Sequence, residues 1–284
     1  MTINKKKIIF IASYPKSGNT WLRSIISSLI YNRKGKFSFD DLKNIFLFSQ
    51  LANFNNIDGK EFNKDGNLNY KWVSKNWIKA QKLINNKKKE IVFYKTHSVR
   101  GIVSNNYFTD ESVCKAFIYI IRDPRDVVVS LSKHAGVDIN LALNDMLFNE
   151  KKMTLFKKVN ELVSTWKNNV DSWMHFKNVP RLIIRYEDLI NNIDASINQI
   201  LEFLNNITDL NINNNINLLK SVKNSTSFKR LQLLEKKQKF SEATIHSKFF
   251  RKGISGGWKQ VLNNNQLDQI INNLKEPMKQ LNYL

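Results

Sequence analysis

The sequence predicts an α/β fold, because short apolar runs typical of buried strands alternate with stretches of helical periodicity. The runs at residues 8–12, 91–94 and 116–121 are rich in β-branched and aromatic side chains, and a fourth begins at Arg181 and continues into a helix. The chain has 284 residues, of which 42% are hydrophobic, and can therefore bury a substantial core. We expect a single domain over residues 1–284.

The first apolar run leads directly into a loop with the features of an anion site. Ile8–Ala12 suits a buried strand, and the apolar residues after Trp21 recur at helical spacing. Between the two, a proline stops the strand and Gly18 permits a backbone turn, so the N–H groups from Lys16 to Thr20 can converge at the start of the helix. Such a nest suits phosphate or sulfate, and Lys16 adds a full positive charge.

The strand, loop and helix resemble a P-loop, whose general pattern is a Gly, any four residues and then Gly-Lys-Ser/Thr. This sequence departs from that pattern. Ser13 stands where the first Gly should be, Asn19 stands where the Lys should be, and the lysine lies in mid-loop. A mid-loop lysine faces a different bridging oxygen from one placed for the β/γ-phosphates of a nucleoside triphosphate. Residues 14–21 instead read Tyr-Pro-Lys-Ser-Gly-Asn-Thr-Trp, which resembles the 5′-phosphosulfate loop of the cytosolic-type sulfotransferases with Asn19 as the only change.

The resemblance implies a three-layer, doubly wound central parallel sheet flanked by helices. It also implies transfer of a sulfuryl group from 3′-phosphoadenosine 5′-phosphosulfate (PAPS) to an acceptor hydroxyl or amine. The resemblance implies no metal ion. An ordinary turn between a strand and a helix is the alternative for the loop alone.

The second strand carries polar residues at its carboxyl end, where open α/β sheets bind ligands. Lys95 and His97 follow the run at residues 91–94 and are expected to project toward the same crevice as Lys16. A lone histidine is more often a surface or structural residue. Lys-Thr-His after a strand nevertheless resembles the second segment of the family, which implies that His97 is the general base, neutral at pH 7. Lys16 and Lys95 would neutralise charge on the bridging oxygen and the transferring group.

The third strand ends at Arg122, and Ser130 lies about two helical turns further on. The pair resembles the family motif that binds the 3′-phosphate, which needs a multidentate Arg and a hydroxyl. An exposed ion pair of Arg122 with Asp123 or Asp126 is the alternative. Tyr186, at the end of the fourth strand, matches a family position near the adenine, although packing explains a tyrosine there equally well.

Two segments near the end of the chain complete the resemblance. Residues 225–229 are similar to the Thr-Ser-Phe element of the family, which implies that Phe228 stacks on the adenine opposite Trp21. Residues 250–259 resemble the Arg-Lys-Gly-x-x-Gly-Asp-Trp-Lys lid, with Gly257 in place of the Asp. A packed polar turn and a flexible basic loop are the respective alternatives. The implied catalytic residues are His97, Lys16 and Lys95, and the implied donor-binding residues are Lys16, Ser17, Gly18, Asn19, Thr20, Trp21, Arg122, Ser130, Tyr186, Thr226, Phe228, Arg251, Lys252 and Gly253.

Composition bounds the remaining possibilities. The net charge of +21 invites a nucleic-acid interpretation, but the lysines are scattered and accompany many Asn and Ile residues, as AT-rich coding DNA produces. We therefore expect no nucleic acid partner. Cys114 is the single cysteine, and no window reaches the roughly 18 apolar residues of a membrane span. These observations predict a cytoplasmic protein without a membrane span.

Two other functions stay open from the sequence. One is a P-loop nucleotide kinase or NTPase, which would need Mg²⁺ ligands and a lysine at Asn19. The other is a basic binder of polyanions without catalysis. Residues 37–77 and 134–154 carry no recognisable motif, so phenol, alcohol, lipid, sugar and amine acceptors are all open, and so is the oligomeric state.

Overall fold

The computed structural model describes residues 6–32, 34–156, 159–238, 240 and 242–284. The chain divides into two compact units. Unit 1 comprises Met1–Tyr14, Ile45–Tyr119 and Glu150–Leu182, and unit 2 comprises Pro15–Asn44, Ile120–Asn149 and Ile183–Leu284. The expected single domain stays a prediction.

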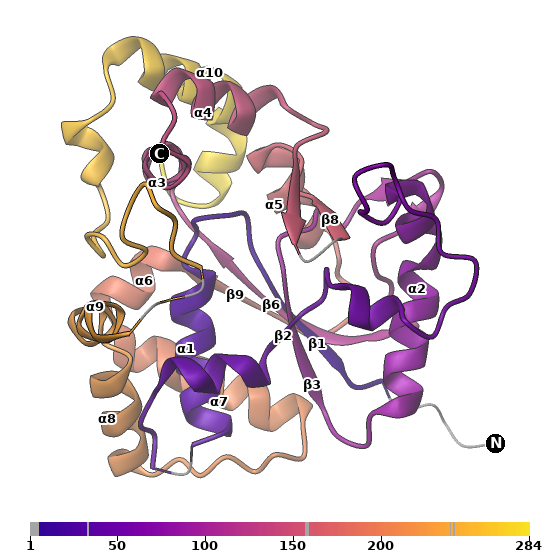
Figure 1. Cartoon of the computed structure of the whole chain (residues 1–284). Coiled ribbons are helices and arrows are strands. Elements are labelled where there is room, and N and C mark those ends of the chain that lie inside the picture. The colour runs from indigo at the N-terminus through magenta and orange to yellow at the C-terminus, as the bar shows by residue number, and fades with distance from the viewer. Residues whose placement is uncertain (1–5, 33, 157–158, 239, 241) are drawn as a thin grey trace. The chain divides into compact units, whose positions relative to one another are not determined.

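The elements are labelled in chain order (Figure 1). The strands are β1 (Ile8–Ala12), β2 (Phe46–Leu47), β3 (Val92–Thr96), β4 (Ile102–Val103), β5 (Asn106–Tyr107), β6 (Cys114–Ile121), β7 (Met153–Phe156), β8 (Val159–Leu162) and β9 (Arg181–Arg185). The α-helices are α1 (Asn19–Ile30), α2 (Tyr70–Lys87), α3 (Pro124–Ala135), α4 (Ile139–Phe148), α5 (Trp166–Met174), α6 (Tyr186–Asn191), α7 (Ile193–Ile207), α8 (Ile216–Ser225), α9 (Phe228–Lys237) and α10 (Asn264–Gln280). The 3₁₀ helices among the described residues are η1 (Phe39–Asn44), η2 (Leu51–Phe54) and η3 (Gly257–Gln260).

The main sheet has five strands in the order β2-β3-β1-β6-β9. Strand β1 pairs in parallel with both β3 and β6, and β2 pairs in parallel with β3. Every residue of β1 is buried, as expected for a parallel strand covered on both faces. The expected fold class, a central parallel sheet flanked by helices, is confirmed. Because the strand order reverses at β1, the carboxyl end of this strand is the place where such sheets bind ligands.

An aromatic cluster forms the core of unit 1. Phe10 of β1 and Phe117 of β6 are paired in register, and both rings contact Trp173 of α5, with centroids 6.1 and 5.0 Å apart, respectively. Phe108 lies 5.4 Å from Phe10 and 5.4 Å from Trp77 of α2. The edge-to-face and tilted geometries are those that aromatic rings prefer. Trp173 is fully buried at the centre of this cluster.

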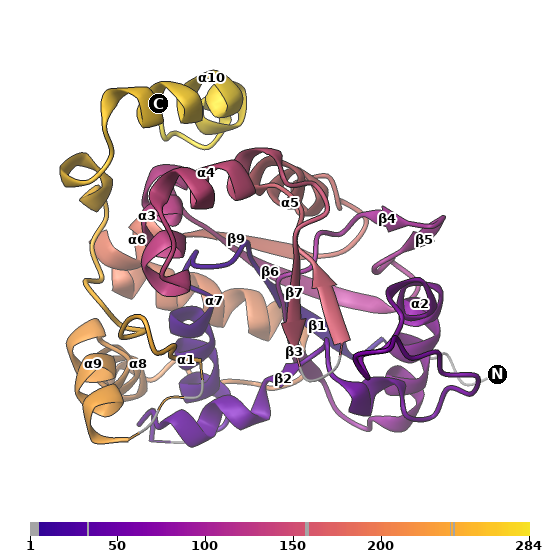
Figure 2. The same cartoon turned by 45° about the horizontal axis from the view of Figure 1, so that its top comes forward.

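Two antiparallel hairpins, which the sequence analysis did not predict, accompany the main sheet in unit 1. Strand β4 pairs with β5, and β7 pairs with β8, the latter pair appearing side by side in Figure 2. In β8 the burial alternates, so that Val159 and Glu161 are buried while Asn160 and Leu162 are partly exposed. The hairpin thereby carries a carboxylate into the interior of unit 1.

Unit 2 is built mainly from helices. Helix α1 packs against α7 and α8, and α10 packs against α3 and α4 (Figure 1). Helix α3 begins with Pro124 in its first turn, and the Asp123 side chain accepts a hydrogen bond from the Arg125 N–H at 2.9 Å. Helix α10 begins with a reciprocal capping box between Asn263 and Gln266. Among the described residues, no helix is both long enough and apolar enough to cross a bilayer.

Candidate active site

The donor loop, residues 15–21, has the backbone geometry of an anion nest. Lys16 has φ 69° and Gly18 has φ 101°, and helix α1 begins directly afterwards at Asn19. Left-handed residues next to a helix N-terminus turn successive N–H groups toward one point, where the helix dipole also favours negative charge. The Ser17 hydroxyl is buried, and no described residue forms a hydrogen bond with it. Since buried hydroxyls normally have a partner, this geometry fits a bound phosphate or sulfate group.

Gly18 is required by its conformation and by its neighbours. A Cβ atom at this position would lie 2.5 Å from Cδ2 of Tyr186 and 3.1 Å from Cδ1 of Ile120. The Tyr186 ring also contacts Trp21, with centroids 5.6 Å apart at 73°. The residue predicted near the adenine therefore lies directly on the predicted donor loop.

Arg122 connects three of the predicted segments. Its guanidinium lies 4.2 Å from the centroid of the Tyr186 ring, Nη1 donates to the Lys16 carbonyl at 3.2 Å, and Nη2 donates to the Ile254 carbonyl at 3.1 Å. Burial raises the pKa of Tyr186, and the nearby Arg122 charge partly offsets this effect. These contacts place the strand-end arginine between the donor loop and residues 250–259, the lid segment.

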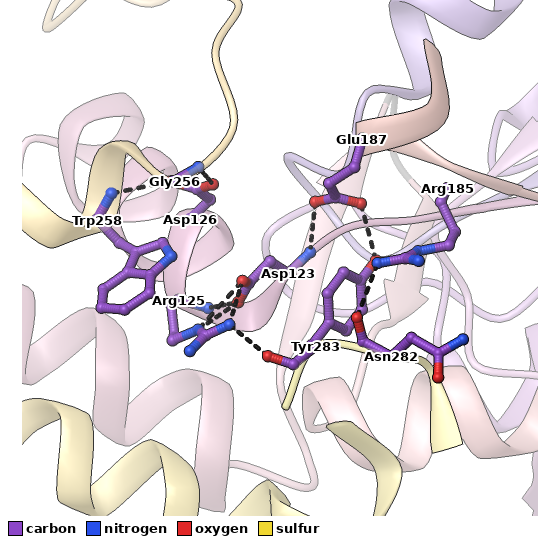
Figure 3. Close-up of polar contacts among 9 residues, drawn as sticks. All are labelled: Asp123, Arg125, Asp126, Arg185, Glu187, Gly256, Trp258, Asn282 and Tyr283. Atoms are coloured by element: carbon purple, nitrogen blue, oxygen red, sulfur yellow. Dashed lines mark hydrogen bonds and ion pairs between the residues drawn. The ribbon is translucent and has the colours of Figure 1, made fainter. Parts of the chain in front are cut away.

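The two acids considered as partners for Arg122 have other roles (Figure 3). Asp123 forms an ion pair with Arg125 at 2.7 Å. Asp126 accepts hydrogen bonds from the N–H groups of Gly256 at 2.7 Å and Trp258 at 3.0 Å, at the start of η3. A carboxylate at this position satisfies backbone donors that have no partner within the short helix. Asp126, which the sequence analysis considered only as an ion-pair partner of Arg122, thus holds the part of the lid segment where Gly257 replaces the family Asp.

Figure 3 also shows how the strand end next to Arg122 is fixed to the end of the chain. The Glu187 carboxylate accepts from the Asp123 N–H at 3.1 Å and from the Tyr283 hydroxyl at 3.0 Å. Burial raises the pKa of Glu187, while these hydrogen bonds act in the opposite direction. The Arg125 guanidinium donates to the Tyr283 carbonyl at 2.7 Å. The predicted 3′-phosphate arginine is therefore followed in sequence by residues of a polar network that reaches the end of the chain.

The residues predicted to surround the adenine come together in unit 2. The Trp21 indole N–H donates to the Thr226 carbonyl at 2.9 Å, and its ring lies 6.2 Å from that of Phe228. A Cβ atom on Gly253, which has φ 63°, would lie 2.3 Å from Cγ of Phe228, so the lid segment packs directly on this ring. The Trp21 and Phe228 rings are inclined at 79°, and stacking of both on one base stays a prediction.

A segment that the sequence analysis did not assign lies against the donor loop. The Thr20 hydroxyl donates to Glu242 at 2.7 Å, and Arg23 forms an ion pair with the same carboxylate. The Lys16 ammonium lies 4.1 Å from the centroid of the Phe249 ring. The Glu242 carboxylate therefore accepts a hydrogen bond from Thr20, a residue that the sequence analysis assigned to donor binding.

The remaining predicted donor residues differ in their exposure. Asn19 is buried in the first turn of α1, and Ser130 lies partly exposed on α3. Arg251 and Lys252 have exposed side chains. The main chain beside them is tethered, because Gln232 of α9 donates to the Arg251 carbonyl at 2.9 Å. Their contact with a 3′-phosphate stays a prediction.

The predicted general base lies in unit 1, where its hydrogen bonds fix its tautomer. His97 is buried, and its Nδ1 lies 2.8 Å from the Ser13 carbonyl and 3.2 Å from the Ser13 hydroxyl. A carbonyl oxygen can only accept, so Nδ1 carries the proton. The lone pair of the neutral imidazole is consequently on Nε2, the nitrogen that can accept a proton from a substrate.

Two buried residues that the sequence analysis missed hold the backbone of His97. Glu161 of β8 accepts from the His97 N–H at 3.0 Å, and Asn169 of α5 donates to the His97 carbonyl at 2.9 Å. Asn169 in turn accepts from the Tyr119 hydroxyl at 2.8 Å. A signal for Asn169 was present, since this polar residue interrupts the apolar helical face of residues 163–173.

The predicted site residues therefore form two sets, one in each unit. Lys95 and His97 belong to unit 1, and the predicted donor-binding residues belong to unit 2. The crevice that these two residues were expected to share with Lys16 stays a prediction. Among the described residues, no cluster of three or more His, Cys, Asp or Glu side chains is suited to hold a metal ion.

Comparison with known proteins identifies the family. A family model for the sulfotransferase domain matches residues 6–282. The chain belongs to the sulfotransferase domain family. It is 28% identical over 274 residues to sulfotransferase 1B1 of Canis lupus familiaris, covering 92% of this chain and 81% of that protein. It is 25% identical over 256 residues to the luciferin sulfotransferase of Photinus pyralis, covering 88% of this chain and 66% of the relative.

Solved structures show the same fold. The mouse sulfotransferase SULT7A1, crystallised with PAP, superimposes with a TM-score of 0.61 at 21% identity, covering 97% of this chain and 85% of the mouse chain. Because the family model spans residues 6–282, the protein is an enzyme of the sulfotransferase class. This membership confirms the resemblance of the chain to the sulfotransferases. The roles of individual residues stay predictions.

Proposed function

We propose that this sulfotransferase uses PAPS as its sulfuryl donor and transfers the group to a hydroxyl or amine of a small-molecule acceptor. The observation that carries the proposal is the convergence, within unit 2, of segments far apart in the sequence on the donor loop. Arg122 contacts the Lys16 carbonyl, Tyr186 lies on Gly18, and Trp21 contacts both Thr226 and Phe228. Residues that contact one another only in the folded chain, and that together match the donor motifs, support a nucleotide site.

Each group of residues has a distinct role in this proposal. The N–H groups of residues 16–20 and the hydroxyls of Ser17 and Thr20 bind the 5′-phosphosulfate, and Lys16 contacts the bridging oxygen. Arg122, with Ser130 and the basic residues of the lid segment, binds the 3′-phosphate. Tyr186, Trp21 and Phe228 surround the adenine.

The transfer itself requires one base and no redox chemistry. The acceptor oxygen or nitrogen attacks the sulfur atom, the bond between sulfur and the bridging oxygen of the 5′-phosphate breaks, and 3′,5′-ADP leaves. The acceptor proton goes to Nε2 of His97, which the Nδ1–H tautomer makes available. Lys16 and Lys95 stabilise the negative charge that develops on the bridging oxygen and on the transferring group.

Cellular location and domain organisation follow as part of the same proposal. The single cysteine, Cys114, is buried, and burial raises the pKa of its thiol to about 12. An inert thiol and the absence of a possible disulfide fit the cytoplasm. Residues 1–284 act as one catalytic domain, in line with a family model that spans residues 6–282.

Isothermal titration calorimetry with 3′,5′-ADP, 5′-AMP, ATP·Mg²⁺ and single-stranded RNA tests the proposal. We expect 3′,5′-ADP to bind most tightly, because each charge-assisted hydrogen bond to the 3′-phosphate contributes roughly 1.5–3 kcal/mol. Arg122→Ala should weaken 3′,5′-ADP toward the affinity of 5′-AMP. Tighter binding of ATP·Mg²⁺ would favour a kinase or NTPase, and tighter binding of RNA would favour a polyanion binder.

A further inference from the structure

The carboxyl end of β3, which carries the proposed general base, is held by one buried carboxylate. Oε1 of Glu161 accepts a hydrogen bond from the Thr96 hydroxyl at 2.8 Å and another from the His97 N–H at 3.0 Å. Glu161 has no exposed surface, and it comes from β8, 64 residues further along the chain than His97. A single oxygen therefore fixes both the side chain of one residue and the main chain of the next.

Ordinary strand pairing does not supply these contacts. Strand β3 ends at Thr96, so the N–H of His97 lies beyond the strand. A buried backbone N–H without an acceptor costs free energy comparable to a lost hydrogen bond. Glu161 provides that acceptor at the residue whose side-chain direction matters for catalysis.

The groups that face Glu161 offset part of the cost of burying its carboxylate. Burial raises the pKa of Glu161, and the Lys95 ammonium and the hydrogen bonds from Thr96 and His97 partly offset this rise. Tyr70 of α2 also faces Glu161, and the carboxylate adds to the effect of burial in raising the pKa of that phenol. A buried acid is costly unless it is paired, and the groups that offset this cost include Lys95, Thr96 and His97, together with a hydrogen bond from Ser49.

The imidazole is sensitive to any movement of this strand end. Its Nδ1–H donates to the Ser13 carbonyl at the end of the neighbouring β1, and the His97 carbonyl is held by Asn169. If the His97 backbone moves away from Glu161, the 2.8 Å contact with Ser13 lengthens and the Nδ1–H tautomer loses its stabilising acceptor. The alternative tautomer places the proton on Nε2, which then cannot accept one from a substrate.

We propose that Glu161 is a positioning residue for the general base: its Oε1 holds Thr96 and the His97 N–H so that the imidazole keeps the Nδ1–H tautomer. The inference rests on the proposed role of His97 but concerns a structural property that can be measured without donor or acceptor.

Nitrogen-15 NMR of the imidazole groups measures that property directly. The chain contains four histidines, and a His97→Gln variant assigns the signals of His97. At a pH where the ring is neutral, the wild type should show Nδ1 protonated and Nε2 unprotonated. Glu161→Gln retains an oxygen acceptor and should keep this tautomer, whereas Glu161→Ala should show a mixture of both tautomers.

Turnover with PAPS and a panel of phenols provides the second readout. Glu161→Ala should lower kcat roughly 10- to 100-fold with little change in the Kd of 3′,5′-ADP, as for loss of a group that orients an active-site histidine, and Glu161→Gln should restore most of it. Glu90→Ala is the matched control, because Glu90 is exposed just before the opposite end of the same strand. Should Glu161→Ala fail to fold, Thr96→Val removes one of the two hydrogen bonds and should produce a weaker form of the same tautomer change.

Three results would overturn the inference. They are a wild-type tautomer in every Glu161 and Thr96 variant, equal losses in Glu161→Ala and Glu90→Ala, and a kcat for Glu161→Gln as low as that of Glu161→Ala. Failure of 3′,5′-ADP to bind would contradict the proposed function instead, and the tautomer measurement would still decide the role of Glu161.

Discussion

Substitution of Gly18 by alanine tests the geometry of the donor loop most sharply. Two separate costs arise at this position. Gly18 has φ 101°, a backbone conformation that costs an L-residue about 1–2 kcal/mol, and the new Cβ would lie 2.5 Å from Cδ2 of Tyr186. Overpacking of this kind typically costs about 1–3 kcal/mol, so we expect the free energy of unfolding to fall by about 2–5 kcal/mol in total.

Gly66→Ala separates the two costs. Gly66 has φ 76°, but a Cβ there would meet no atom within 4 Å, so this variant bears the backbone cost alone. Urea unfolding of both variants should therefore give a difference of about 1–3 kcal/mol, which measures the contact with Tyr186. Calorimetry should show that Gly18→Ala weakens 3′,5′-ADP binding, because the loop N–H groups are displaced, and that Gly66→Ala does not.

Equal losses of stability in Gly18→Ala and Gly66→Ala would contradict this prediction. Equal losses would mean that Tyr186 does not lie on Gly18, and the convergence of the predicted adenine residue with the donor loop would be wrong. Full retention of 3′,5′-ADP affinity in a destabilised Gly18→Ala variant would remove the loop from the donor site.

Three other perturbations give distinct results. Lys16→Met should lower turnover at least about 100-fold while 3′,5′-ADP binding changes less, since the proposed role of its charge is to stabilise the transition state; unchanged turnover excludes Lys16 from the mechanism. Glu242→Ala should tighten 3′,5′-ADP binding about tenfold in calorimetry, because a phosphate must displace this carboxylate from Thr20; weaker binding would assign Glu242 a supporting role. Burial raises the pKa of Glu187, so the protonated carboxyl group favours folding. This contribution to the free energy of unfolding is complete below the pKa of Glu in the unfolded chain, about 4.3, and is lost as pH rises through the pKa of the folded state. Glu187→Gln should therefore gain stability relative to wild type between pH 4 and pH 7 in urea unfolding, and a loss over that interval would contradict the sign of the shift.

The elements with strong local signals were predicted well. The strand at Ile8–Ala12 has the predicted bounds, because a continuous run of β-branched and aromatic residues between polar segments has few alternatives. Helix α1 begins at Asn19, before the apolar residues whose spacing indicated it, because Gly18 ends the loop. Strand β3 extends through Lys95 and Thr96, since pairing with β1 outweighs their polarity.

The missed features depend on contacts across long sequence separations. Strand β2 and the β4–β5 hairpin have strands of two residues each, too short for any periodicity. The burial of Glu161 follows from the register of β8 in its hairpin, which no local pattern specifies. Asp126 holds main-chain groups 130 and 132 residues away, and such a partner is visible only in the folded chain.

One labelled-donor experiment tests the central claim most directly. The claim is that this chain transfers sulfuryl groups from PAPS with His97 as the base. Purified wild type, His97→Ala and the exposed control His175→Ala are incubated with ³⁵S-labelled PAPS and cell extract, and labelled products are separated by chromatography. The account predicts a labelled acceptor with wild type and His175→Ala, and a rate lowered roughly 10²–10⁴-fold with His97→Ala. Equal labelling by all three proteins, or labelling with adenosine 5′-phosphosulfate as readily as with PAPS, would contradict it.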